Sequence, residues 1–134
     1  VGQSDRFLIP KIVKHFKEKK RILHLGNICV AREFGDVRQV TNLYRLLMES
    51  NGYGDVFNVC TGEAVYIYKI LEICQELTGY EPKVVTDPRF IRDKEIDVLI
   101  GNNQKLLTTI GKDFYPTSIR NLLEWMLFDK GDLK

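Results

Sequence analysis

The sequence has few of the residues that build disulfide scaffolds or metal centres. It contains three cysteines and two histidines in 134 residues, and no Cys-x-x-Cys pair. Cys29, Cys60 and Cys74 are odd in number and widely spaced, and each lies in an apolar stretch. This pattern predicts free, buried thiols in a reducing compartment. We therefore expect a cytoplasmic protein without a metal site.

The chain also lacks a large excess of charge of one sign and a long apolar run. Its formal net charge is +2, which gives no indication of a surface for nucleic acid or membrane. No stretch resembles a transmembrane helix or a signal peptide. The one dense basic run, residues 17–21, is interpreted as the solvated end of a helix. With 44% hydrophobic residues, the composition is that of one globular domain, residues 1–134.

Cofactor and catalytic motifs are missing as well. No GxGxxG or GxxGxxG loop follows an expected strand, so the chain has no dinucleotide-binding fingerprint. No tyrosine is followed four residues later by lysine, and no GxSxG, HExxH or P-loop pattern occurs. We therefore expect the chain alone to bind no NAD(P) and to catalyse nothing. Its first residues, from Val1, read like a loop within a longer protein, which favours a fragment.

Hydrophobic periodicity and end signals predict about five helices. The first places Phe7 among the apolar residues of its buried face. Asp36 is expected to cap the second, and Gly79 to end the third. The inward residues expected for the second helix are Val40, Leu43, Tyr44 and Leu47. The five expected helices are residues 7–16, 37–50, 65–78, 105–111 and 118–127.

Shorter apolar runs between these segments predict strands. The expected extended pieces are residues 22–25, 28–34, 56–60 and 83–87, and residues 51–55 are expected to form a turn. Together the segments predict an α/β fold, a small mixed lobe of about five helices and several short strands.

Four stretches occur in the order and at the spacing of four blocks of one enzyme family. They are GQSDRFLIPKIV (2–13), GNICVAREFGDVRQV (26–40), FNVCTGEAVYIYKIL (57–71) and RDKEIDVLIGNNQKL (92–106). Together they resemble the C-terminal, substrate-binding part of extended short-chain dehydrogenases/reductases that act on nucleotide sugars. The likeness is greatest to GDP-4-keto-6-deoxy-mannose reductases and next to GDP-mannose 4,6-dehydratases. It covers nearly the whole chain, but only the second half of the family's protein.

The resemblance implies the C-terminal part of a Rossmann-fold enzyme whose N-terminal NAD(P)-binding domain is missing here. The implied function is the substrate-binding part of an NAD(P)-dependent reductase of the C4 ketone of a GDP-4-keto-6-deoxy sugar. A dehydratase or epimerase of GDP-, UDP- or dTDP-sugars is the alternative, and a non-catalytic binding module is a second alternative. A face normally covered by the cofactor domain could drive formation of a homo-oligomer.

The resemblance also assigns substrate-binding residues. An arginine in a strand is costly to dehydrate unless it meets an anion, and in this family the arginines at the positions of Arg32 and Arg92 close on the diphosphate. Glu95 matches an acidic position that accepts hydrogen bonds from ribose hydroxyls, and Leu8 and Lys11 match the stretch that lines the guanine site. The residues themselves leave open surface ion pairs for Arg32 and Arg92, a solvated Glu95 and a plain surface Lys11.

Four positions depart from the family pattern. Glu33 and Gln39 stand where aspartates are usual, Asp93 replaces a proline, and Asn102 replaces an aspartate. Gln39 and Asn102 each remove a carboxylate from the local hydrogen bonding, and Asp93 could compete with phosphate for Arg92. These changes bear on which substrate the site takes.

Overall fold

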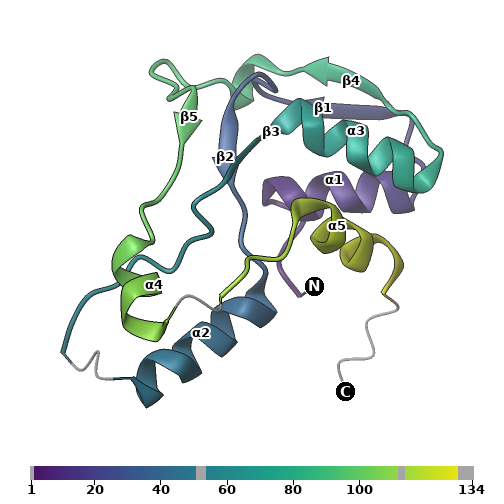
Figure 1. Ribbon diagram of the computed structural model, residues 1–134. Helices are drawn as coiled ribbons and strands as arrows, with labels where there is room; N and C mark the ends of the chain where they lie inside the picture. The colour runs from purple at the N-terminus through teal and green to yellow at the C-terminus, as the bar shows by residue number, and fades with distance from the viewer. Residues whose placement is uncertain (1, 51–53, 112–113, 130–134) are drawn as a thin grey trace.

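The computed structural model describes residues 2–50, 54–111 and 114–129, in which helices alternate with short strands (Figure 1). In chain order the elements are α1 (Leu8–Lys17), β1 (Ile22–Leu25), β2 (Ala31–Glu33), α2 (Val37–Glu49), β3 (Ala64–Tyr66), α3 (Ile67–Thr78), β4 (Lys83–Thr86), a 3₁₀ turn η1 (Pro88–Phe90), β5 (Val98–Leu99), α4 (Gln104–Ile110) and α5 (Ile119–Phe128). The expected mixed α/β fold with five helices is confirmed.

Three helices and a two-stranded parallel sheet enclose the main hydrophobic core. Helices α1, α3 and α5 pack against one another, and Figure 1 shows the β1–β4 ribbon across α3 and α1, away from α5. Burying a large aliphatic side chain stabilises a fold by about 1.5–3 kcal/mol. The side chains without exposed surface in this core are Ile12, Leu23, Ile70, Cys74 and Leu123.

A second sheet joins this core to the rest of the chain. Strand β2 lies between antiparallel β3 and parallel β5. Arg32 stands opposite Val65 on one side and Leu99 on the other. Figure 1 shows β5 at the outer edge of this sheet and α2 and α4 beyond it, apart from the three-helix core. The sheet therefore brings Arg32 beside Ile96, which is 64 positions away in the sequence.

Two helix-end predictions are confirmed. The Asp36 side chain accepts a hydrogen bond from the Arg38 backbone N–H and caps α2. Gly79 ends α3 in the left-handed conformation, with φ of 63°, which glycine adopts without steric cost.

The expected inward face of α2 is only partly correct. Leu43 is buried, but Tyr44 is 55% exposed, and Val40 and Leu47 are half-buried. Helix α4, which packs on α2, has only seven residues and covers a short part of it. In α1, Phe7 is likewise exposed, because the helix begins one residue later and buries Ile9 instead.

Some of the strand predictions were wrong. Residues 56–60 form no strand, because β3 and β5 already occupy both edges of β2. Residues 64–66, part of which was assigned to a helix, pair with β2 instead. The two-residue strand β5 was not predicted, since so short a run has no detectable alternation. Residues 51–53 of the expected turn lie outside the described residues.

The three thiols are free, but they differ in burial. Cys74 is buried, and loss of solvent raises its pKa to about 12. Cys60 is half-buried, and desolvation, with the nearby Glu33 carboxylate, raises its pKa. The prediction that Cys29 is buried was wrong: it lies in the bend between β1 and β2, where its N–H donates to the Asn27 side chain.

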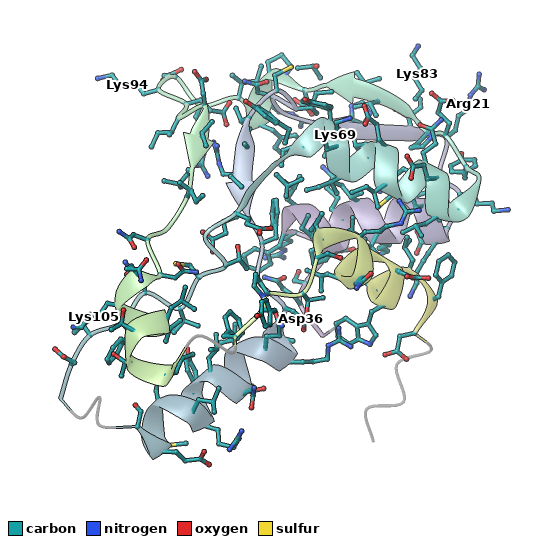
Figure 2. All side chains as sticks on the ribbon, in the orientation of Figure 1. Arg21, Asp36, Lys69, Lys83, Lys94 and Lys105 are labelled. Atoms are coloured by element: carbon teal, nitrogen blue, oxygen red, sulfur yellow. The ribbon has the colours of Figure 1, made fainter. Side chains whose placement is uncertain are left out.

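The basic run after α1 is solvent-exposed, as expected for a helix end. Figure 2 shows Arg21 and Lys83 pointing outward at the same end of the β1–β4 sheet. Within the described ranges, no helix has the length and apolar character needed to cross a membrane. No group of three histidine, cysteine or acidic residues among them could hold a metal ion.

Two buried aspartates should make the stability of the fold depend on pH. Hydrogen bonds from Arg38 lower the pKa of Asp36, and hydrogen bonds from Arg89 lower the pKa of Asp87 from 3.8 to about 2. Below about pH 4 the unfolded chain therefore binds more protons than the folded one. We expect the free energy of unfolding to be constant above about pH 5 and to decrease as the pH falls towards 2.

Denaturant unfolding at a series of pH values measures this dependence. Asp87→Asn should show a smaller loss of stability between about pH 5 and pH 2 than the unaltered chain, because one linked proton is removed. Asp93→Asn is the matched control, since the Asp93 carboxylate has no hydrogen bond or ion pair among the described residues. Identical pH profiles for Asp87→Asn and the unaltered chain would contradict the prediction.

Candidate functional site

A cavity of about 450 Å³ lies where the start of α1, the end of β1, strand β2 and residues 90–95 meet. All five residues that the sequence assigned to substrate binding line it, namely Leu8, Lys11, Arg32, Arg92 and Glu95. They come from three parts of the chain that β2 and its neighbours bring together. The structure thus places these residues around one cavity.

The Arg32 guanidinium is largely engaged with the protein itself. Its Nη1 donates to the carbonyl oxygens of Ala31 at 2.8 Å, Ile96 at 2.7 Å and Asp97 at 3.5 Å. Its Nη2 lies 3.4 Å from Oε1 of Glu95. An arginine has five N–H donors, so Nε–H and one Nη2–H remain available to a ligand. Arg32 therefore both holds residues 95–97 and faces the cavity.

Glu95 has one carboxylate oxygen without a partner. Its side chain is 18% exposed, and Oε2 is buried without a hydrogen bond among the described residues. An unpaired buried acceptor costs free energy until a donor reaches it. Because Glu95 lines the cavity, a hydroxyl-bearing ligand is a suitable donor.

Arg92 is a cation of the cavity that has no protein partner among the described residues. It is exposed and has no hydrogen bond or ion pair within the described part of the chain. In particular, no ion pair joins it to Asp93, the neighbour expected to compete for it. Its guanidinium can therefore bind an anionic ligand without breaking a protein contact.

Lys11, Phe90 and Leu8 add cationic and apolar groups to the cavity lining. The Lys11 Nζ donates to the His24 carbonyl oxygen at 2.5 Å and lies 4.3 Å from the centre of the Phe90 ring. A cation over an aromatic face is attracted by the ring's negative charge distribution. Leu8 is half-buried at the same wall. The cavity therefore contains an aromatic ring and an aliphatic side chain beside the Lys11 ammonium.

The close contact between Gly26 and η1 shapes this wall. A Cβ atom on Gly26 would overlap the Phe90 carbonyl oxygen and lie 2.9 Å from its carbonyl carbon. Only glycine therefore lets the chain after β1 approach residues 88–90 so closely. Asp87 stabilises η1, because its side chain caps the turn and forms an ion pair with Arg89.

The electrostatic character of the cavity is positive. Among the described residues, four cationic side chains and one carboxylate line it, namely Arg6, Lys11, Arg32, Arg92 and Glu95. Such a balance favours a ligand with about two negative charges, and arginine forks suit phosphate oxygens.

The other residues that depart from the family pattern make structural contacts. Gln39 accepts from the Thr117 N–H at 2.7 Å and donates to the Tyr115 carbonyl at 2.9 Å, joining α2 to the segment before α5. Asn102 accepts from the Gln104 N–H at 2.9 Å at the start of α4. Both amides therefore replace a carboxylate in local packing, and neither lines the cavity.

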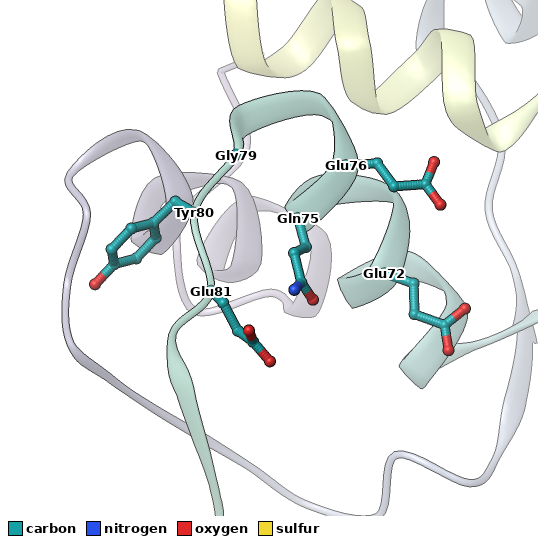
Figure 3. A pocket seen from close by; sticks show the side chains of 6 residues that line it. All are labelled: Glu72, Gln75, Glu76, Gly79, Tyr80 and Glu81. Carbon is teal, nitrogen blue, oxygen red and sulfur yellow. The ribbon is translucent and has the colours of Figure 1, made fainter.

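A second hollow, at the C-terminal end of α3, lacks the features of a site. Figure 3 shows its glutamates spread around the rim instead of meeting at one point. Glu72 pairs with Lys69 and Glu76 with Arg120, both on the surface. We therefore assign no function to it.

Comparison with known proteins agrees with this arrangement. The chain is 31% identical over 126 residues to GDP-6-deoxy-D-talose 4-dehydrogenase of Aggregatibacter actinomycetemcomitans, covering 94% of this chain and 43% of the relative. It is 30% identical over 115 residues to GDP-6-deoxy-D-mannose reductase of Pseudomonas aeruginosa, covering 82% and 38%. The chain therefore spans about two fifths of the length of these curated relatives. No protein-family model matches it.

A solved structure extends the match to the fold. RMD of Pseudomonas aeruginosa, complexed with NADPH, superposes with a TM-score of 0.82 at 28% identity, covering 94% of this chain and 42% of that one. The chain is thus similar in sequence and fold to about two fifths of these extended short-chain dehydrogenases/reductases. Its resemblance to nucleotide-sugar reductases of this family, inferred from four sequence blocks, is confirmed.

Several residues that line the cavity were not assigned from the sequence, Arg6 and Phe90 among them. Arg6 is an exposed lining residue within the first matching block, and its charge near Leu8 was the available signal. Phe90 is brought to Lys11 by the β1–β4 pairing, which no local pattern indicates.

Proposed function

We propose that this chain is the nucleotide-sugar-binding part of an NAD(P)-dependent reductase that acts on the C4 ketone of a GDP-4-keto-6-deoxy sugar. One observation carries the proposal: Arg32, Arg92, Glu95, Lys11 and Leu8, separate in sequence, line the same positively charged cavity. The names of the two curated relatives, both acting on GDP-sugars, support the substrate class.

Each cavity residue has a distinct proposed role. Arg92 binds the diphosphate directly, and Arg32 contributes its free donors while it holds residues 95–97. The buried Oε2 of Glu95 accepts a hydrogen bond from a ribose hydroxyl. Leu8 and Lys11 line the place of the base. Together these contacts orient the nucleotide and leave the sugar at the open side of the cavity.

The described residues do not fit a dinucleotide cofactor. Strand β3 passes directly into α3 without a glycine-rich turn, and β1 leads into a bend instead of a helix. NAD(P), which accompanies the RMD relative as NADPH, is therefore proposed for another domain of the intact protein. In this proposal, residues 1–134 bind and orient the substrate and carry no step of hydride transfer.

A dehydratase is the second candidate, because Glu95 occupies the acidic position of the dehydratase pattern and faces the cavity. The intact protein distinguishes the two. A reductase consumes NADPH or NADH with a GDP-4-keto-6-deoxy sugar, whereas a dehydratase converts GDP-mannose without net consumption of the cofactor. A non-catalytic module does neither but retains the nucleotide.

NMR titration of the 134-residue chain tests nucleotide binding. We expect weak, saturable shifts with GDP at residues of the cavity, smaller shifts with UDP, and none with NADPH. Arg120→Ala is a control that removes a surface arginine paired with Glu76, outside the cavity. No shifts with GDP at millimolar concentration, or saturable binding of NADPH, would overturn the proposal.

A further inference from the structure

The carboxylate of Glu33, in β2, joins three separate parts of the chain. It accepts hydrogen bonds from the backbone N–H groups of Thr61 and Gly101, the latter at 2.9 Å. These donors lie 28 and 68 positions away. Both contacts are partly buried, so water replaces the carboxylate poorly if it is lost.

The backbone around Gly101 is tightly packed against Cys60 and Glu33. A Cβ atom on Gly101 would lie 2.6 Å from the Cys60 Sγ and 3.4 Å from Oε2 of Glu33. The Asn103 side chain also donates to the carbonyl oxygens of Cys60 and Thr61, at 3.2 and 3.0 Å. The turns around residues 61 and 101 are therefore locked to each other and to β2.

Strand β5, which precedes Gly101, has little else to hold it. Val98 and Leu99 are 48% and 52% exposed, so apolar burial contributes little to their placement. Their backbone pairs with β2 over two residue pairs only. Polar contacts at the ends of β5 must therefore fix its position.

Two consecutive residues of β2 supply those contacts. Arg32 binds the carbonyl oxygens of Ile96 and Asp97 before β5, and Glu33 binds the Gly101 N–H after it. Adjacent side chains of a strand point to opposite faces, so the two hold β5 from both sides.

We propose that Glu33 is a positioning residue of the nucleotide-sugar cavity: by holding Gly101 it fixes β5 and, through β5, the segment that carries Glu95 and Arg92. The inference rests on the proposed function. Glu33 does not line the cavity, and it acts through the residues that do.

The carboxylate is specifically required, because two N–H donors need two acceptor oxygens. Glu33→Gln keeps the size but turns an NH₂ group towards one of the donors. Glu33→Asp keeps the charge but is one methylene shorter, so its carboxylate can bind one of the two N–H donors but not both well. The matched control is Glu63→Gln, an identical change at an exposed carboxylate without a partner among the described residues.

The test measures GDP affinity and amide hydrogen exchange on the whole 134-residue chain. Glu33→Gln should weaken GDP binding about tenfold, the effect of a lost hydrogen bond to a charged group, with Glu33→Asp in between and Glu63→Gln unchanged. The backbone amide of Ala31 donates to the Asp97 carbonyl oxygen. In Glu33→Gln, this amide and the amide of Gly101 should exchange hydrogen faster. In a Glu95→Gln background the Glu33→Gln change should weaken GDP binding less, since Glu33 acts in part through Glu95.

The outcomes separate this inference from the proposed function. Unchanged GDP affinity in Glu33→Gln, or the same loss with and without Glu95, overturns the positioning role, because general destabilisation adds independently of Glu95. If the unaltered chain does not bind GDP, the proposed function fails, but hydrogen exchange still tests the positioning role. Faster exchange at Gly101 and Ala31 in Glu33→Gln supports positioning of β5, and unchanged exchange overturns it. If Glu33→Gln does not fold, Glu33→Asp gives the same readouts.

Discussion

Arg92→Ala is expected to weaken GDP binding about ten- to a hundredfold, because a charge-assisted hydrogen bond contributes about 1.5–3 kcal/mol. Arg92→Lys should recover little, since an ammonium cannot make the two parallel hydrogen bonds of a guanidinium. Among the described residues Arg92 has no partner to lose, so its replacement should leave thermal stability unchanged. Isothermal or NMR titration with GDP measures the affinity.

The comparison with Arg32→Ala sharpens this test. In Arg32→Ala the carbonyl oxygens of Ile96 and Asp97 and the Glu95 carboxylate lose a hydrogen-bond donor. This variant should therefore lose both GDP affinity and stability. Arg120→Ala should lose neither affinity nor cavity shifts. Full GDP affinity in Arg92→Ala would show that the cavity does not bind a diphosphate through this residue.

Gly26→Ala is expected to destabilise the chain by about 1–3 kcal/mol, the usual cost of forcing an extra carbon into a packed site. The added Cβ would overlap the Phe90 carbonyl oxygen, which is backbone and cannot rotate away. The segment 88–90 must then move off β1, and Phe90 with it. GDP affinity should therefore decrease together with the unfolding free energy.

Gly35→Ala provides the control, because its Cβ would meet only a Val40 methyl group at an ordinary 3.9 Å. It should be neutral or stabilise the chain by about 0.4–1 kcal/mol through reduced freedom of the unfolded state. Urea unfolding compares the two variants. Equal stabilities for Gly26→Ala and Gly35→Ala would show that residues 88–90 yield without cost.

The helices were predictable because their signals are local. Asp36 at the start of α2 and Gly79 at the end of α3 satisfy backbone groups within one turn of the chain. The exposure of Tyr44 was not predictable, because it depends on the length of α4, more than fifty positions later. Likewise the alternation in residues 56–60 does not reveal that both edges of β2 are occupied.

The candidate site was predictable as a set of residues but not as a set of contacts. Arg32 and Arg92 stood out because guanidinium groups need anions and because the sequence blocks matched a family. That Arg32 uses its Nη1 donors on carbonyl oxygens, while Arg92 has no protein partner among the described residues, follows from the course of residues 95–97 past β2. Glu33 appeared only as a departure from a pattern, since its partners are in distant segments.

The arrangement of the sheets has a consequence for the order of folding. Helix α1 forms from contacts between residues close in sequence. Strand β1 pairs with β4, and β2, α2, β3 and α3 lie between these two strands in the sequence. Arg32 reaches Ile96 across 64 positions, and Glu33 reaches Gly101 across 68. Closing such long loops is entropically costly and slows folding. The cavity depends on these distant pairings and the helical core on the equally distant packing of α1 with α5, so we expect both to form late and together.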